Sequence, residues 1–173
     1  MELTKPERLI LYNQYLILQE LDALQGTEPR PSYEEYKAIL SNGFTYSYSM
    51  FDRWIDDEIP MAKQELVMDI LSTYREIEVY KKDHPEDHEV IDHVNGIFGG
   101  FDDNNERDYL SFLCFVVGKQ NLFTEQLAYM KTTNNFNAHV RMVETYRSMV
   151  SVFKSFKHYT KTREQILQIL NAN

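Results

Sequence analysis

Apolar side chains recur at steps of three and four residues over long stretches of this chain, which is the spacing of one face of an α-helix. The clearest stretch ends near Lys81 and Lys82. Its apolar positions are Leu66, Val67, Ile70, Leu71, Tyr74 and Ile77. The sequence shows no alternation of apolar and polar residues bounded by hairpin dipeptides, the pattern of paired strands. It therefore predicts an all-α protein.

Several predicted helices start with a capping box, in which a Ser or Thr and a Glu or Gln three residues later satisfy backbone N–H groups of the first turn. The pairs are Thr4 with Glu7, Ser32 with Glu35, and Thr162 with Gln165. We expect the first helix to end near Gln25 and the second to end at Gly43.

Two more helices are expected farther along. Residues 46–55 place Met50, Phe51 and Trp54 on one face. A helix entered near Asn137 carries Val140, Val143, Tyr146, Met149, Val150 and Phe153. Residues 83–103 are the least regular part. Because 173 residues is the size of one ordinary domain, we expect a single domain over residues 1–173, built as a bundle of six to eight helices.

The first predicted helix is apolar on more than one face. Leu9, Tyr12 and Leu16 mark one stripe. The neighbouring apolar residues are Ile10, Leu11, Tyr15, Ile17, Leu18 and Leu21. A stripe this broad is typical of a helix that is buried on two sides. We expect one side to face the core and the other a second subunit, which predicts a homodimer.

Charge is spread unevenly along this chain, whose formal net charge is −9. Residues 83–108 carry one basic and nine acidic side chains, and residues 109–173 carry eight basic and three acidic ones. We expect these two segments to attract each other, within one chain or across a homodimer. The overall negative field disfavours nonspecific binding to nucleic acid or to anionic membranes.

The single cysteine, Cys114, permits no intramolecular disulfide and fits a reducing compartment. The stretch from Leu9 to Leu18 is broken by Asn13 and Gln14 and follows no basic cluster, unlike a signal peptide. No run of apolar residues approaches the length of a transmembrane helix. We therefore expect a cytoplasmic protein.

The glycine-rich and acidic stretch GIFGGFDDNNERDYL is the sharpest candidate for chemistry. Its glycines do not form a G-x-G-x-x-G phosphate loop, and the acidic residues would repel phosphate. A calcium loop would alternate oxygen ligands, as Asp102, Asn104 and Glu106 do. However, Arg107 stands where that loop needs glycine, and Leu113 stands where it needs glutamate. Neither kind of site is predicted.

The start of a helix explains the same stretch. The glycine pair permits a sharp turn. Asp103 or one of the asparagines then caps the helix, and Glu106, three residues after Asp103, completes a capping box. The segment that follows contains one polar residue, Ser111. We expect a helix near residues 104–118, buried all round at the centre of the bundle, with a buried strand as the competing interpretation. Cys114 is then an inert buried thiol.

Residues His84, His88 and Asp92 recur at steps of four and could hold a transition metal on one helix face. The alternative is a solvated acidic segment with surface histidines, because no fourth ligand is evident. The other histidines, expected to be structural or exposed, are His93, His139 and His158. No serine lies in a G-x-S-x-G context. We assign no metal site, no cofactor and no catalytic residue.

Two segments could contact nucleic acid. Residues 33–55 read as helix, glycine turn and helix, but the second helix carries more acidic than basic side chains, whereas a helix among phosphates should be basic. Residues 153–163, FKSFKHYTKTR, interleave aromatic and basic side chains that could bind a single strand. We expect instead that the aromatic side chains pack inward while the lysines face solvent or the acidic segment.

Four short motifs, taken together, resemble the YfbU family. They are RLILYNQY (Arg8–Tyr15), GFDDNNERDYL (Gly100–Leu110), FNAH (Phe136–His139) and EQILQILNA (Glu164–Ala172), in matching order over nearly the whole chain. The resemblance implies a cytosolic bacterial protein that is mostly helical and of about this length, and it implies no catalytic residue. The stretch DHPEDHEVIDH departs from the family pattern.

We therefore expect a non-enzymatic helical interaction or regulatory module that acts as a homodimer through protein partners. Exposure of part of the Leu9–Leu21 stripe on a single chain would favour it. Two other functions stay open. One is a small-ligand-binding protein or enzyme with a pocket between helices. The other is a nucleic-acid-linked regulator that uses the basic C-terminal face.

Overall fold

The computed structural model describes residues 2–28, 30–53, 55–130, 132–157 and 161–172. Within these ranges the chain forms nine α-helices and two 3₁₀-helices, and the one β-type contact is an isolated bridge between Phe101 and Asn137. The all-α prediction is confirmed. The helices outnumber the six to eight expected because three of them are four residues long, too short to leave a periodic pattern.

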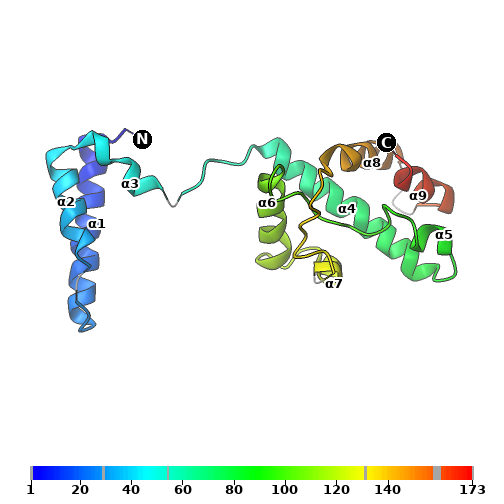
Figure 1. The fold of residues 1–173 in the computed structure, drawn as a ribbon, viewed down its shortest axis with the longest axis horizontal. Helices are drawn as coiled ribbons and strands as arrows, with labels where there is room; N and C mark the ends of the chain where they lie inside the picture. Colours follow the sequence, from blue (N-terminus) through cyan, green and yellow to red (C-terminus); the bar gives the residue numbers. More distant parts are fainter. Residues whose placement is uncertain (1, 29, 54, 131, 158–160, 173) are drawn as a thin grey trace. The chain divides into compact units, whose positions relative to one another are not determined.

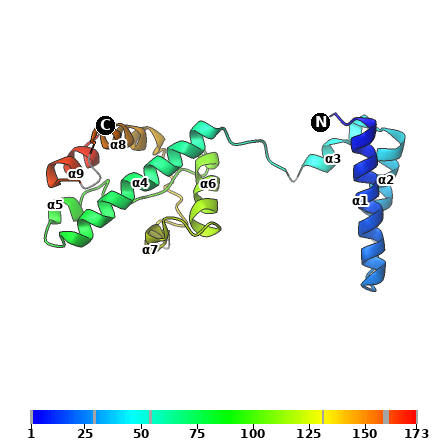
Figure 2. The same cartoon turned by 180° about the vertical axis from the view of Figure 1, so that it is seen from behind.

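The chain divides into two compact units, Met1–Glu58 and Ile59–Asn173, and each is described by itself. The first unit is a helical hairpin, in which α1 (Lys5–Leu24) and α2 (Ser32–Asn42) lie side by side (Figures 1 and 2). The expectation of one domain over residues 1–173 stays a prediction.

The predicted helix caps of α1 and α2 are only partly observed. Thr4 and Glu7 form the capping box of α1, as expected, and Gly43 ends α2 in the left-handed conformation with a φ of 69°. The capping box at Ser32 is wrong, because Pro31 occupies the N-cap position and Ser32 is already the first helical residue.

The helix expected over residues 46–55 is replaced by two shorter elements. A 3₁₀ turn, η1 (Thr45–Ser47), is followed by the four-residue helix α3 (Ser49–Asp52). Of the residues expected on its inner face, Met50 and Phe51 are half-buried, and Trp54 lies outside the described residues.

The second unit is built around α4 (Met61–Asp83). In Figure 1, α4 runs between α6 (Arg107–Gly118) and α8 (Val143–Ser155), and α9 (Arg163–Leu170) lies near its C-terminal end beside the short helix α5 (His88–Ile91). The turn η2 (Thr124–Gln126) and α7 (Leu127–Met130) complete the unit. The six apolar positions predicted for α4 are all buried.

The helix expected near residues 104–118 is present as α6, but it begins at Arg107 and buries one face. Its buried residues are Tyr109, Leu110, Leu113, Val116 and Val117. Phe115, by contrast, is 47% exposed, so the central helix is α4. Apolar composition alone did not distinguish a central helix from one at the edge. Cys114 is half-buried, and burial raises the pKa of its thiol, which disfavours the reactive thiolate.

Residues 83–103, the least regular part of the sequence, supply core side chains. Phe98 and Phe101 are fully buried. The ring centroid of Phe98 lies 5.1 Å from that of Tyr74 and 5.6 Å from that of Tyr146, which are distances of aromatic packing. Irregular backbone therefore contributes to the core together with the helices.

The helix expected to enter near Asn137 begins only at Val143, as α8. The three residues Asn134, Asn135 and Phe136 take left-handed φ values of 47°, 58° and 64°, which turn the chain instead of starting a helix. The apolar positions from Val143 onward follow the predicted pattern.

Candidate interaction surface

Helix α1 is 20 residues long, and although the structure describes every one of them, none is buried. One face is half-buried against the rest of the hairpin. Its residues are Arg8, Leu11, Tyr12, Tyr15, Gln19 and Asp22, at steps of three and four. Because a helix in water gains most of its stability by packing an apolar face, α2 alone leaves α1 under-packed.

Aromatic rings hold the inner face of α1 against its neighbours. The ring centroid of Tyr15 lies 5.8 Å from that of Tyr33, 5.0 Å from that of Tyr36 and 6.1 Å from that of Phe51. Burial raises the pKa of the Tyr15 phenol, because a phenolate would be poorly hydrated among these rings. The cluster packs α1 against α2 and α3.

A polar network adds to the same contact. Lys37 is 8% exposed, and its Nζ donates hydrogen bonds of 2.6 Å to the side-chain oxygens of Gln19 and Glu34. Gln19 in turn donates to Glu34 at 3.0 Å. The hydrogen bond from Lys37, and then that from Gln19, lowers the pKa of Glu34. The buried ammonium is therefore satisfied by a structural network.

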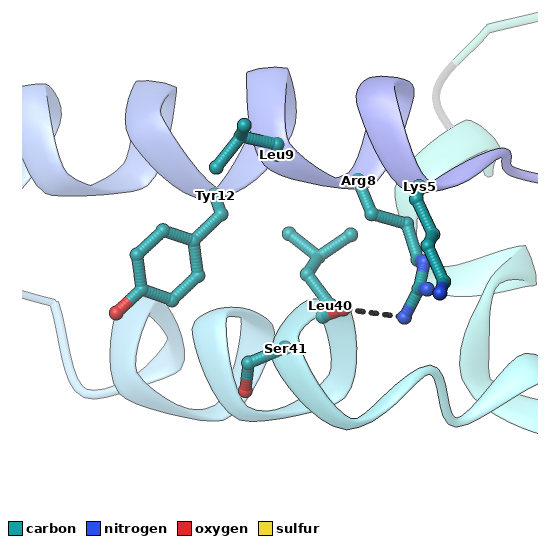
Figure 3. Close-up of a pocket in the computed structure, with 6 residues that line it drawn as sticks. All are labelled: Lys5, Arg8, Leu9, Tyr12, Leu40 and Ser41. Atoms are coloured by element: carbon teal, nitrogen blue, oxygen red, sulfur yellow. Dashed lines mark hydrogen bonds between the residues drawn. The ribbon is translucent and has the colours of Figure 1, made fainter.

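At the N-terminal end of α1, Arg8 reaches the C-terminal end of α2. Figure 3 shows its guanidinium donating to the carbonyl oxygen of Leu40, at 3.0 Å. The cavity around it, about 270 Å³, is lined by Lys5, Arg8, Leu9, Tyr12, Leu40 and Ser41. A Cβ on Gly43 would lie 2.6 Å from the guanidinium nitrogen, so glycine makes room for it. Arg8 thus caps α2, where the helix dipole favours a cation.

The face of α1 away from α2 is apolar and exposed. Ile10, Ile17, Leu21 and Leu24 are 58, 59, 45 and 82% exposed, and we call these four residues the outward stripe. At about 100° per residue they lie within about 60° of one another around the helix. Soluble monomers rarely expose contiguous apolar patches, so the outward stripe is a candidate interaction surface.

The sequence predicted a second apolar side on this helix but did not include Leu24 in it. The spacing of seven residues from Ile10 to Ile17 and again to Leu24 is the signal that identifies it. The outward face of α2 is polar by comparison. Its exposed residues are Glu34, Glu35, Ala38, Ser41 and Asn42. An exposed apolar face, interrupted by Gln14, is therefore a property of α1 and not of α2.

The stretch tested as a phosphate or calcium loop is a turn closed by its own side chains. The carboxylate of Asp102, a residue only 4% exposed, accepts hydrogen bonds from the side-chain amide of Asn105 and the backbone N–H of Asn104. The amide of Asn105 contributes most to lowering the pKa of Asp102. Across the described residues, no three His, Cys, Asp or Glu side chains gather as they would around a metal ion.

The carboxylate of Glu106 caps a helix, but not the one expected. The capping box predicted with Asp103 is wrong, because Glu106 is itself the N-cap residue of α6 and its side chain turns toward α8. It accepts backbone N–H bonds of 2.9 Å from Met142 and Val143, and one of 3.1 Å from Asp102. Sequence reasoning missed this contact because it joins residues 36 and 37 positions apart.

The structure brings together two of the motifs quoted above, GFDDNNERDYL and FNAH. The N–H of Phe101 donates to the carbonyl oxygen of Phe136 at 2.9 Å, and the N–H of Ala138 donates to that of Phe101 at 3.0 Å. The guanidinium of Arg141 donates to the side-chain oxygen of Asn105 at 2.8 Å. These contacts join the segment before α6 to the segment before α8, which is a structural role.

The three residues His84, His88 and Asp92 do not share a helix face. His84 is the C-cap of α4, whereas His88 is the first residue of α5. The His84 ring stacks on Tyr80 at 4.4 Å between centroids. The Nδ1 atom of His88 lies 3.7 Å from a carboxylate oxygen of Asp92. Their side chains are 80 and 74% exposed, so the two residues form a surface pair.

The remaining histidines fit a structural or surface role where they are described. The ring of His93 lies 3.4 Å from the side-chain oxygen of Asn171, and exposed His139 lies 3.1 Å from the side-chain nitrogen of Asn134. His158 lies outside the described residues.

The basic residues near the C-terminal end contact acidic and aromatic side chains. Lys154 pairs with Asp69 at 2.5 Å, and Arg163 pairs with Asp87 at 2.8 Å and with Glu89. Arg163 is also the main cause of the lowered pKa of Asp87. The expected attraction between the acidic middle and the basic end therefore occurs within one chain at Arg163.

The aromatic side chains of this segment are covered by a lysine. Lys161 is 9% exposed, and its Nζ lies 4.8 Å from the ring centroid of Phe153 and 5.9 Å from that of Phe156. Tyr159 lies outside the described residues. The rings of Phe153 and Phe156 are half-buried, as the inward-packing interpretation expects.

After Gly43, the described part of residues 33–55 contains no helix long enough to be the recognition helix of a helix-turn-helix. After Gly43 the only α-helix described in residues 33–55 is α3, which has four residues. That is one turn, whereas a recognition helix must span several turns to lie in a major groove. Separately, among the described residues no helix combines the length and the hydropathy that a membrane span requires.

Comparison with known proteins gives a family. The YfbU domain matches residues 1–172 of this chain. The UPF0304 protein MJECS11 of Methanocaldococcus jannaschii is 42% identical over 173 residues, which covers 98% of this chain and 99% of that protein. This relative comes from an archaeon, so the similarity extends beyond the bacteria that the resemblance implied.

Proposed function

The chain belongs to the YfbU family, and we propose that it is a non-enzymatic helical interaction module that acts as a homodimer. The observation that carries this proposal is the outward stripe, whose four side chains are 45 to 82% exposed on a single chain. A second copy covers the stripe, so that two α1 helices pack face to face.

A second copy suits this surface because the surface is complementary to itself. A two-fold dimer brings the same patch of both copies together. The stripe runs along a helix of 20 residues, about 30 Å long, and an aliphatic stripe on one helix packs well against an identical stripe on another. The polar outward face of α2 offers no such surface, which leaves α2 on the outer side of each α1.

The free energy gained by burying the stripe is comparable with the cost of association. Full burial of an Ile or Leu side chain contributes about 1.5–3 kcal/mol, so eight such side chains, roughly half exposed, contribute about 6–12 kcal/mol. This falls within the roughly 4–15 kcal/mol that association costs in translational and rotational freedom. Leu9, Leu16 and Leu18 are also exposed on α1, outside the outward stripe.

We place this module in the cytoplasm, with other proteins as its partners. The single thiol, Cys114, fits a reducing compartment. The net charge of −9 disfavours nucleic acid, and the ion pairs of Lys154 and Arg163 lessen the positive field of the C-terminal face.

The test is the mass of the full chain in solution, by native mass spectrometry and sedimentation equilibrium. We expect twice the chain mass for the wild type and a single chain for Ile17→Glu, because a buried carboxylate in the middle of the stripe has no partner. The matched control is Val79→Glu, which changes an aliphatic residue of α4 that is 48% exposed and should stay dimeric.

Two results would overturn the proposal. One is a wild-type chain that stays single at every concentration reached. The other is an Ile17→Glu variant that keeps both the dimer mass and the helical circular dichroism of the wild type, since α1 would then lie outside the interface.

A further inference from the structure

The outward stripe has the spacing of a coiled-coil seam. Ile10, Ile17, Leu21 and Leu24 are separated by seven, four and three residues. Gln14, which is exposed like the stripe, fills the remaining seam position between Ile10 and Ile17. The seam therefore runs at steps of four, three, four and three, which keeps two helices in contact along their length.

The two ends of α1 differ in charge. Lys5 and Arg8 lie at the positive pole of the helix dipole, but both line the cavity against α2 and are not part of the outward stripe. Glu20 and Asp22 lie near the negative pole, and the last turn, all of which is described, contains no basic residue. A single chain therefore leaves acidic side chains where the dipole disfavours them.

We propose that the two α1 helices of the dimer run antiparallel, with the two-fold axis crossing between Gln14 and Ile17. This inference rests on the proposed homodimer. The negative pole of each α1, where Glu20 lies, is then beside the positive pole of the partner's α1. A parallel pair would instead place like poles of the two helix dipoles together at both ends.

The seam spacing sets the register of the antiparallel pair. Ile10 packs beside the partner's Leu21, and Gln14 packs beside the partner's Ile17. The two Gln14 residues, related by the two-fold axis, are then about 4.5 Å apart along the helix axis. Their amides can hydrogen-bond to each other. A shifted register would bury each amide against apolar side chains without a partner, which is costly.

Disulfide trapping in the full chain distinguishes the two orientations. The background is Cys114→Ser, which removes the native thiol. Three variants are compared in it: Ile10→Cys, Leu21→Cys, and the two substitutions together. Positions 10 and 21 are about 16 Å apart along one helix, too far for a bond within the chain, because a disulfide needs Cα atoms within about 7 Å. Val79→Cys serves as the surface control.

The antiparallel pair predicts covalent dimers from the double variant under mild oxidation, and no covalent dimer from either single variant. Covalent dimers from Ile10→Cys alone and from Leu21→Cys alone would show a parallel pair, and would overturn the inference while the homodimer stands. A native dimer that none of the three variants traps also overturns it. A single-chain mass for the wild type overturns the proposed function itself, so the two failures are distinguishable.

Discussion

The carboxylate of Glu106 lies 2.9 Å from the backbone nitrogen of Val143, so the residue that precedes α6 caps the first turn of α8. The same carboxylate accepts backbone hydrogen bonds from Met142 and Asp102. Glu106 is only 7% exposed, so water competes little for these hydrogen bonds. One side chain therefore joins two helix starts and the loop before them.

Glu106→Gln should lower the free energy of unfolding by about 2 kcal/mol. An amide offers one acceptor oxygen and turns an N–H₂ group toward backbone donors, which leaves some of them unsatisfied. Urea unfolding followed by circular dichroism measures the change. Glu144→Gln is the control, because Glu144 lies in the first turn of α8 with its side chain 89% exposed. Equal losses for both variants would contradict the role given to Glu106.

Asp102 makes the free energy of unfolding depend on pH in the acidic range. Hydrogen bonds, chiefly from Asn105, hold the pKa of its carboxyl below the ordinary 3.8. Because the folded pKa is the lower one, the contribution is complete above the unfolded pKa and is lost as the pH falls through the folded pKa. Asp102→Asn should therefore be less stable than the wild type at neutral pH. The difference in free energy of unfolding between the two proteins should become smaller toward about pH 2.

Unfolding midpoints in urea across this pH range test the effect of Asp102. Asp103→Asn is the matched control, because it makes the same change at the exposed neighbouring residue. A gap between Asp102→Asn and the wild type that stays constant with pH would show that the lost packing, and not the ionised carboxylate, matters.

Gly100 and Gly118 should respond to alanine in opposite directions. Gly100 has a φ of 88°, and a Cβ there would lie 1.8 Å from the carbonyl oxygen of Phe136. Gly100→Ala should lose about 3 kcal/mol or more, since both strain and a clash arise. At Gly118 a Cβ meets no described atom within 4 Å, and Gly118→Ala should gain about 0.4–1 kcal/mol. Thermal unfolding compares the two, and similar melting temperatures would contradict this account.

Gln126 is fully buried, and neither polar atom of its side chain has a hydrogen-bond partner among the described residues. Gln126→Met keeps the side-chain length and removes the buried amide, so the free energy of unfolding should rise by about 1–2 kcal/mol. Gln120→Met, at an exposed position, should change little. A loss of stability in Gln126→Met would reveal a buried water bound to the amide.

Gln14→Leu should tighten the dimer and weaken its preference for one orientation. A polar residue in a seam costs affinity and specifies the pairing, so we expect the dissociation constant to fall at least about tenfold. Sedimentation equilibrium measures it, with Ser41→Leu on the polar face of α2 as the control. Introduced with Ile10→Cys, Gln14→Leu should also allow some trapping from that single cysteine. A weaker dimer would place Gln14 outside the seam.

The helices that sequence reasoning located well are those governed by neighbours a few residues away. The apolar positions of α4 are buried as expected, and Thr162 and Gln165 form the capping box of α9. Hydrogen bonds of a capping box and the packing of a helix face both depend on spacings of three and four residues. The four-residue helices α3, α5 and α7 carry too little sequence to show such a pattern.

The candidate surface was predictable in part. Apolar residues on more than one face of α1 predicted two packed sides. The seven-residue spacing of its outward stripe is also visible in the sequence. Which side α2 covers, and that the outward face of α2 is polar, required the position of Tyr15 among its aromatic neighbours.

By itself the sequence determined the helical class, several helix ends, the seam spacing of α1 and the unequal charge of the chain, because each depends on residues close together in the chain. The tertiary structure alone decided that α4 and not α6 is central, that Glu106 caps α8, and that His84 is separated from His88. These outcomes depend on contacts between distant segments or on where a helix happens to end. Local periodicity does not encode such contacts, since the same apolar helix can pack at the centre or at the edge.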